Sequence, residues 1–199
     1  MQGCRFEGGW RGHLLKSRAR HNLIRYDLMR DGLSGGASYE LELAEGGDNT
    51  VVGNIFVQGP GTQNRSIVAV GYDAQPERGH RLVFAYNTVV NQAWWPAHFL
   101  RVWDRALPNV GTCTVAQNLF VGRGITGIPP DSDAGGNRQL LLDALENIGG
   151  DRYCPATACG AVNAGISQSS PAWLPERQFQ LPLGTRVRSA DGCRGAVGS

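Results

Sequence analysis

The sequence predicts an all-β protein built as a parallel β-solenoid of about four coils, followed by an irregular C-terminal tail. The chain of 199 residues contains four self-similar segments, and its 28 glycines show no Gly-X-Y period of the collagen type. Its apolar runs are short and rich in β-branched residues, which is typical of strands joined by tight turns. Helical repeats of similar length are excluded because these segments predict no helices.

Each repeat places an Asn or Asp between two apolar strands. The polar positions are 27, 33 and 31 residues apart, so one coil takes about thirty residues. Coils stacked at about 4.8 Å bring equivalent positions into continuous columns. An asparagine in such a column can bond the backbone of the next coil through its side-chain amide. We therefore expect one stacked line formed by Asp27, Asn54, Asn87 and Asn118.

Three strands are expected in each coil. An alternating strand comes first, and two shorter strands flank the polar position. The first strands are HLLKSR (13–18), SYELELA (38–44), SIVAVGYD (66–73) and HFLRVWD (98–104). The segments that follow are HNLIRYDLMRDG (21–32), DNTVVGNIFVQG (48–59), RLVFAYNTVVNQ (81–92) and TCTVAQNLFVGR (112–123).

Residues 126–199 are expected to form a C-terminal cap and an extended tail of the same domain as the coils at 1–125. The stretch LLLDALENIGG (140–150) predicts a short helix or an irregular cover. The proline-rich stretch SSPAWLPERQFQLPLG predicts an extended tail, with Trp173 and Phe179 packed on the solenoid.

Composition argues against several classes of partner. The net charge of +2 and the lack of a basic block predict neither a nucleic-acid partner nor a membrane surface. No apolar run approaches the ~20 residues of a membrane span. The start MQGCRFEGGW lacks the pattern of a signal peptide. Five cysteines leave at least one without a partner in the chain, and a disulfide among Cys154, Cys159 and Cys193 stays open.

Several segments resemble a known class of proteins. GHLLKSRA, SYELELAEGGDNTVVGNIFVQGPGTQNRS and the closing CGAVNAGISQSSPAWLP and DGCRGAVG are similar to a bacterial branch of the right-handed parallel β-helix, pectate-lyase-like proteins. This resemblance implies a polysaccharide ligand, anionic by preference, and an extracellular or periplasmic location. Four coils are few for a solenoid, which needs capped ends. We therefore expect further N-terminal coils or self-association at the open end.

Lys16 is the only lysine in the chain. In the lyases that this class includes, a Lys-Ser pair supplies the base for β-elimination and an arginine on the next coil supplies the acid. Lys16-Ser17 matches the first half, and the resemblance names Lys16, Arg18 and His13 as catalytic candidates. The next coil carries Glu40 and Glu42 where the arginine would stand. The alternative is a lateral ion-pair ladder between the two coils, worth about 0 to 1 kcal/mol per pair.

Acidic residues and tryptophans supply the other candidates. Glu40 and Glu42 are expected beside Lys16, where they could contact substrate or act as the carboxylate pair of a glycoside hydrolase. Together with Glu45 and Asp48 they form an acidic cluster whose oxygens suit calcium, although no metal ligand is assigned. Trp94, Trp95 and Trp103 offer flat apolar faces to sugar rings. With Arg101 they complete the predicted substrate-binding set: Glu40, Glu42, Trp94, Trp95, Arg101 and Trp103.

The sequence leaves open whether the protein is an enzyme. The first hypothesis is a carbohydrate-active or carbohydrate-binding protein, lyase-like on anionic polysaccharide. The second is a surface or adhesion module in which the coils are only a scaffold. The alternative enzyme is the glycoside hydrolase with paired carboxylates.

Overall fold

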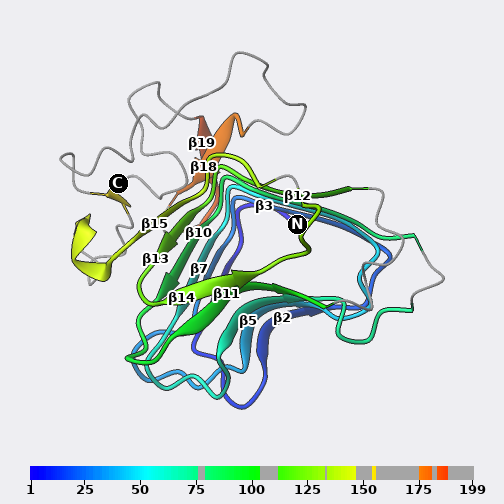
Figure 1. Cartoon of the computed structure of the whole chain (residues 1–199). Helices are drawn as coiled ribbons and strands as arrows, with labels where there is room; N and C mark the ends of the chain where they lie inside the picture. Colours follow the sequence, from blue (N-terminus) through cyan, green and yellow to red (C-terminus); the bar gives the residue numbers. More distant parts are fainter. Residues whose placement is uncertain are drawn as a thin grey trace.

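The computed structural model describes residues 1–75, 79–103, 112–132, 134–146, 154–155, 175–180 and 183–187. Regular structure in these ranges is β-strand apart from one short 3-10 helix, η2 (Leu142–Ala144). Three sheets of stacked strands surround a common interior (Figure 1). The prediction of an all-β fold is confirmed, and the stacked parallel strands are consistent with a solenoid.

The three sheets are parallel throughout and contain strands from successive repeats. The first sheet contains β1 (Arg5–Glu7), β4 (Leu28–Arg30), β7 (Ile55–Gln58), β10 (Thr88–Asn91), β13 (Leu119–Val121) and β15 (Arg138–Leu140). The second contains β2 (His13–Ser17), β5 (Tyr39–Leu43), β8 (Ser66–Val70), β11 (Ala97–Val102) and β14 (Gly124–Gly127). The third contains β3 (His21–Arg25), β6 (Asp48–Val52), β9 (Arg81–Ala85) and β12 (Thr112–Ala116).

Consecutive strands of the chain lie in different sheets. From β1 to β11, each strand pairs with the strand three places later, so the chain visits the three sheets in a fixed order. The pairing follows the sequence repeats, because Val51 stands opposite both Ile24 and Phe84. Equivalent apolar residues therefore stack in columns. The sheets also contact one another across the interior: Phe56 of the first sheet packs on Phe84 of the third, and Phe99 of the second packs on Phe120 of the first, with ring centroids 6.1 Å and 5.2 Å apart.

Equivalent polar side chains of successive repeats are joined by hydrogen bonds into a ladder. Asp27, Asn54 and Asn87 each donate their backbone N–H to the side-chain oxygen of the next member at 2.9 Å. Asn118 continues the ladder to Asn137, also at 2.9 Å. The predicted line through positions 27, 54, 87 and 118 is confirmed, and Asn137 is a fifth member that the repeat pattern did not reveal.

A left-handed backbone turn precedes each member of the ladder. Tyr26, Tyr86 and Gln117 have φ angles of 56°, 55° and 57°, and Gly53 has 69°. L-residues rarely adopt this region without compensation. The buried hydrogen bonds of the following asparagine supply it, so the bend between the third and first sheets is held by the ladder.

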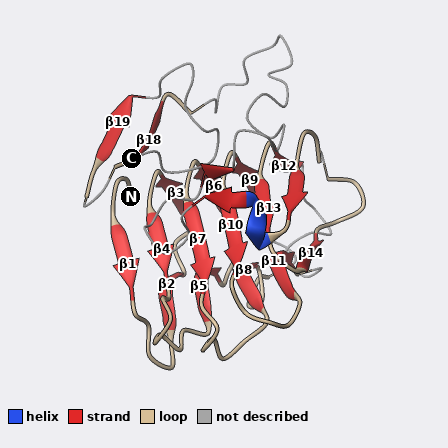
Figure 2. Cartoon of the chain, turned by 90° about the vertical axis from the view of Figure 1, so that its left-hand side faces the viewer, coloured by secondary structure: helices blue, strands red, loops and turns tan. Residues whose placement is uncertain are grey.

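The outer face of the first sheet is covered. Its outward side chains form a second apolar cluster that includes Leu145 and Phe179 from the C-terminal part of the chain. Figure 2 shows this sheet with β18 (Arg177–Phe179) and β19 (Thr185–Val187) beyond its end. The predicted packing of Phe179 is confirmed, whereas Trp173 lies outside the described residues. The outward apolar strand residues are Leu28, Ile55, Val57, Val90, Leu119 and Val121.

Of the short helix and the irregular cover expected over 140–150, the described residues show the irregular cover. Within the stretch 140–150, the described part forms only the 3-10 turn η2 and then β16 (Leu145–Glu146), which pairs antiparallel with β17 (Cys154–Pro155). Leu145 is buried against the first sheet, and this packing favours an extended backbone over a helix. The cysteine side chains considered for a disulfide lie outside the described residues. Across the described ranges, no helix has the length and apolar character that a membrane crossing requires.

Candidate functional site

The outer face of the second sheet carries polar and aromatic side chains. On β5, Tyr39 and Glu42 face outward, whereas Leu41 and Leu43 belong to the core. Outward residues are thus three positions apart rather than two, which indicates an irregular pleat. The same spacing occurs on β11, where the register shifts between His98 and Leu100.

A compact polar cluster joins β2 to β5. Lys16 and Glu42 are paired in register, and the Lys16 Nζ lies 2.5 Å from the Glu42 Oε2. The His13 Nε2 lies 3.0 Å from the same oxygen. The His13 ring also packs on the Tyr39 ring, with centroids 4.9 Å apart. The predicted ion pair between Lys16 and Glu42 is therefore present.

The protonation of His13 follows from its surroundings. Burial lowers the pKa of His13, with a further lowering by the Lys16 charge and an opposing effect of Glu42. A neutral imidazole can donate from only one nitrogen, and the Glu42 carboxylate can only accept, so Nε2 carries the proton. The His13 Nδ1 is enclosed and has no hydrogen-bond partner among the described residues. The His13 Nε2 is therefore directed at Glu42, and the enclosed Nδ1 is not available to solvent as a base.

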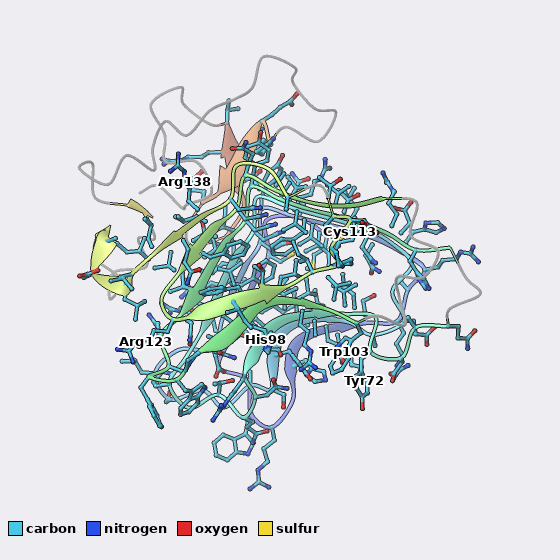
Figure 3. The ribbon with its side chains drawn as sticks, in the orientation of Figure 1. Tyr72, His98, Trp103, Cys113, Arg123 and Arg138 are labelled. Carbon is cyan, nitrogen blue, oxygen red and sulfur yellow. The ribbon has the colours of Figure 1, made fainter. Side chains whose placement is uncertain are left out.

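A second cluster lies on the same sheet. The Arg101 guanidinium stacks over the Trp103 ring, with its Cζ 3.6 Å from the ring centroid. The Trp103 ring meets Tyr72 edge to face at 5.0 Å, and Tyr72 is 54% exposed. Figure 3 shows Tyr72, Trp103 and His98 along the second sheet. Burial and the Arg101 charge lower the pKa of His98, so His98 is neutral near pH 7.

The two clusters belong to one column. Glu42 on β5 and Arg101 on β11 are both in register with Ala69 on β8. Lys16, Glu42 and Arg101 therefore follow one another across the sheet, with the small Ala69 between the last two. We call this surface the sheet-face site: His13, Lys16, Tyr39, Glu42, Ala69, Tyr72, Arg101 and Trp103.

Arg18 and Glu40 do not join this site as expected. Arg18 is exposed just beyond the end of β2, where its guanidinium binds Glu45 at 3.2 Å and Asp73 at 2.7 Å. Glu40 is fully buried, so its predicted place beside Lys16 is wrong. The irregular pleat of β5 leaves Glu40 fully enclosed, whereas Glu42, only 4% exposed, reaches the Lys16 Nζ on the outer face. Both Glu40 oxygens lack a hydrogen-bond partner on any other described residue.

The acidic cluster is divided among separate contacts. Glu42 binds Lys16, Glu45 binds Arg18, and Asp48 binds the Arg81 Nε at 2.8 Å. No group of three or more His, Cys, Asp or Glu within the described ranges has the arrangement of a metal site. The burial of Glu40 also separates the two carboxylates that the hydrolase alternative requires on one face.

Trp94 and Trp95 lie away from the sheet-face site. They belong to the turn between β10 and β11, at the corner of the first and second sheets, and their rings meet edge to face at 5.1 Å. Trp94 is 76% exposed. Of the predicted substrate-binding residues, the structure therefore brings Glu42, Arg101 and Trp103 to one surface and leaves Glu40, Trp94 and Trp95 elsewhere.

Sequence reasoning missed Tyr39 and Tyr72 as members of the sheet-face site. Tyr39 is the residue that pairs with His13, and Tyr72 follows the next strand of the same sheet. Aligning the alternating strands of successive repeats could have found Tyr39, because the alignment places it opposite His13. Tyr72 falls within the predicted strand 66–73 but beyond the end of β8 at Val70, so strand alternation did not indicate its contact with Trp103.

Comparison with known proteins gives no relative. No protein-family model matches the chain, and the searches of curated proteins and of solved structures also found no match.

Proposed function

We propose that the protein is a right-handed parallel β-helix of the pectate-lyase-like class and that its sheet-face site binds an anionic polysaccharide. The observation that carries this proposal is the in-register column of Lys16, Glu42 and Arg101, flanked by the stacked rings of Trp103 and Tyr72. A polysaccharide is a linear ligand with repeated charges and flat ring faces. A sheet surface with cations and aromatic rings across successive strands matches that repeat.

The charges of the site favour a carboxylate-bearing sugar. Lys16 and Arg101 carry positive charge, Glu42 carries one negative charge, and His13 is neutral because its pKa is lowered. The Arg101 guanidinium is held flat on Trp103, which leaves its N–H groups oriented for bidentate contact with a carboxylate. Trp103 and Tyr72 add apolar surface beside that contact.

Binding without elimination accounts best for the contacts of Lys16. β-Elimination needs a base with a free lone pair and a nearby acid to protonate the leaving oxygen. The Lys16 nitrogen is held in an ion pair with Glu42, and Glu42 stands at the register position where the resemblance would require an arginine. We therefore favour a non-catalytic binding surface over a lyase. An extracellular or periplasmic location accompanies this proposal, since it follows from the same resemblance.

Calorimetric titration with alginate, pectate and chondroitin oligosaccharides tests the proposal. We expect the wild type to bind at least one of them, with affinity that falls as salt rises. Arg101→Gln and Trp103→Ala should each weaken binding about tenfold, since these residues are the anchors. Arg81→Gln is the matched control, because Arg81 is an exposed arginine on the third sheet that binds Asp48. Equal binding by the wild type and both anchor variants would contradict the proposal.

Ultraviolet absorbance of unsaturated uronate separates binding from catalysis in the same samples. We expect no product from the wild type. Product formation that is lost in Lys16→Gln and in Lys16→Arg would establish the lyase instead, because arginine cannot serve as the base.

A further inference from the structure

We propose that a recess at the corner of the first and second sheets is a second binding site, which takes one acidic sugar residue. Its volume is about 400 Å³, within the range of about 300 to 1,000 Å³ that is usual for ligand sites. Three segments line it: the turn after β10, the turn after β13 and the η2 segment. The lining residues are Gln92, Ala93, Trp94, Gly122, Arg123, Leu141, Leu142 and Asp143.

A buried amide fixes the frame of this recess. The Asn91 Nδ2 donates to the carbonyl oxygens of Trp95 at 2.8 Å and Arg123 at 2.7 Å, and so joins the first two segments. The Gly122 N–H donates to the Leu140 carbonyl at 2.8 Å, which holds the third. Asn91 is fully buried, so these bonds are sheltered from water. The recess is therefore formed before a ligand arrives, which lowers the ordering cost of binding.

The second turn requires glycine at this point. Gly122 has a φ angle of +98°, and a Cβ there would collide with the Asn91 carbonyl oxygen. The close approach of the two turns brings Arg123 beside the Trp94 turn. Gly122 permits this tight packing of the two turns, and it thereby places the Arg123 guanidinium next to the exposed Trp94 ring.

The lining chemistry matches a pyranose ring with a carboxylate. The exposed Trp94 ring and Leu141 offer apolar surface to the C–H face of a sugar. The exposed Arg123 guanidinium suits bidentate binding of a carboxylate. The Gln92 amide and the Asp143 carboxylate supply hydrogen-bonding groups for ring hydroxyls. A uronate differs from a neutral sugar in offering a carboxylate to Arg123, so the preference for an acidic sugar rests on that cation, while Gln92 and Asp143 serve hydroxyls.

This recess is separate from the sheet-face site. Figure 3 shows Arg123 on the opposite side of the view from Trp103 and Tyr72. No residue is shared between the two sets, so the recess can bind whether or not the sheet face does. Two sites on one chain would contact the same polysaccharide at two points and raise its overall affinity through effective concentration.

Titration of a galacturonate trisaccharide and of the matching galactose trisaccharide tests the recess. The experiment uses the Arg101→Gln/Trp103→Ala double variant, in which the sheet-face site is removed. We expect the acidic trisaccharide to bind with one site per chain and the neutral one about tenfold more weakly. Adding Trp94→Ala should reduce the remaining affinity about tenfold, whereas Trp94→Phe should retain most of it because it keeps a flat ring.

The charge requirement is tested at Arg123. Arg123→Gln should weaken the acidic trisaccharide about tenfold and leave the neutral one unchanged, and Arg123→Lys should fall between. Trp10→Ala is the control for loss of an exposed aromatic ring elsewhere, because Trp10 is 75% exposed and belongs to neither site. It should change nothing in this background. Equal affinity for the two sugars, no measurable binding, or binding that ignores both Trp94 and Arg123 would each overturn the assignment. Unchanged urea midpoints would show that the variants fold.

Discussion

Two groups of polar side chains are buried inside the sheets, and they differ in how their hydrogen bonds are met. In the ladder at the bend between the third and first sheets, each asparagine has hydrogen-bond partners for both its side-chain oxygen and its amide nitrogen. Asn87, for example, accepts from the Asn54 N–H at 2.9 Å and donates to the Val51 carbonyl at 2.9 Å. At the other end of β4, the buried Asp31 and Glu40 are both acceptors when ionised, and Glu40 has no partner on another described residue.

The interior therefore contains two kinds of buried polar group, those with hydrogen-bond partners and those without. A buried polar group stabilises the fold when a partner is fixed in place, and it costs free energy when none is. Each asparagine of the ladder offers both a donor and an acceptor at the equivalent position of its repeat, so neighbouring repeats satisfy one another's hydrogen bonds. Glu40 precedes Leu41, which is in register with Val68 and, through it, with Leu100, and the apolar side chains of this core offer no hydrogen bonds.

Breaking the ladder should give the largest effect. Asn87→Ala removes the partners of the Asn54 N–H and the Val51 carbonyl, and both of these groups are buried. We expect a loss of about 3 kcal/mol or more in the free energy of unfolding, measured by urea denaturation. Asn22→Ala is the matched control, since Asn22 also donates to a stacked asparagine, Asn49, at 2.8 Å but lies nearer to solvent. Its loss should be about 1 kcal/mol; equal losses would contradict the role given to burial.

Replacing Glu40 should act in the opposite direction. Burial and the Asp31 charge hold the pKa of Glu40 well above its ordinary value of 4.5. The folded state therefore binds the proton more tightly than the unfolded state, so stability is highest below the ordinary pKa and falls as pH rises. Glu40→Leu removes this pH-dependent loss of stability and places an apolar side chain among the core residues. At pH 7 we expect a gain of about 1 to 3 kcal/mol in the free energy of unfolding.

The gain from Glu40→Leu should shrink as pH falls toward 4.5, because the wild type then keeps its proton in both states. Urea titrations at several pH values measure this difference. Glu42→Leu is the control two residues away, and it should not stabilise because it removes the partner of Lys16 and His13. A less stable Glu40→Leu protein at pH 7 would show that the carboxylate has a stabilising partner.

The asparagine ladder and the buried Glu40 also differ in how far the sequence could predict them. The ladder repeats at equivalent positions, so four of its members were visible as a pattern, and stacking physics supplied the role. Asn137 lies only 19 residues after Asn118 and breaks the period, which hid it. A single Glu40 has no repeat to reveal it. Strict alternation puts Glu40 and Glu42 on one face, and only the irregular pleat of β5 separates them.

The sheet-face site could also be predicted only in part. Lys16 and Glu42 could be paired from the aligned repeats, because both stand at the same height of successive first strands. The enclosure of the His13 Nδ1 could not be predicted, since it depends on how the Tyr39 ring packs. The recess at Trp94 and Arg123 joins turns that are about thirty residues apart with the η2 segment, and no pattern relates those three.

Converting Asp27, the first member of the ladder and an acidic one, should give the smallest effect of the three. Asp27 occupies an asparagine position, and burial raises its pKa to about 6, partly opposed by the N–H that Cys4 donates to Oδ1 at 2.7 Å. Its Oδ2 has no hydrogen-bond partner in the described part of the chain. Because the folded pKa is raised above 3.8, this group's stabilising effect is complete below pH 3.8 and declines as pH rises toward 6.

Asp27→Asn should therefore stabilise the protein at pH 7 by about 1 to 2 kcal/mol. The new amide can donate to the Asn54 Oδ1, as the Asn54 Nδ2 donates to the Asn87 Oδ1 at 3.1 Å. Thermal or urea unfolding at pH 7 and pH 4 measures the effect, and the gain should shrink at the lower pH because Asp27 is then protonated. Asp48→Asn, at an exposed position, is the control and should change stability little at pH 7. A gain that is equal at both pH values would mean that the proton on Asp27 contributes nothing to the ladder.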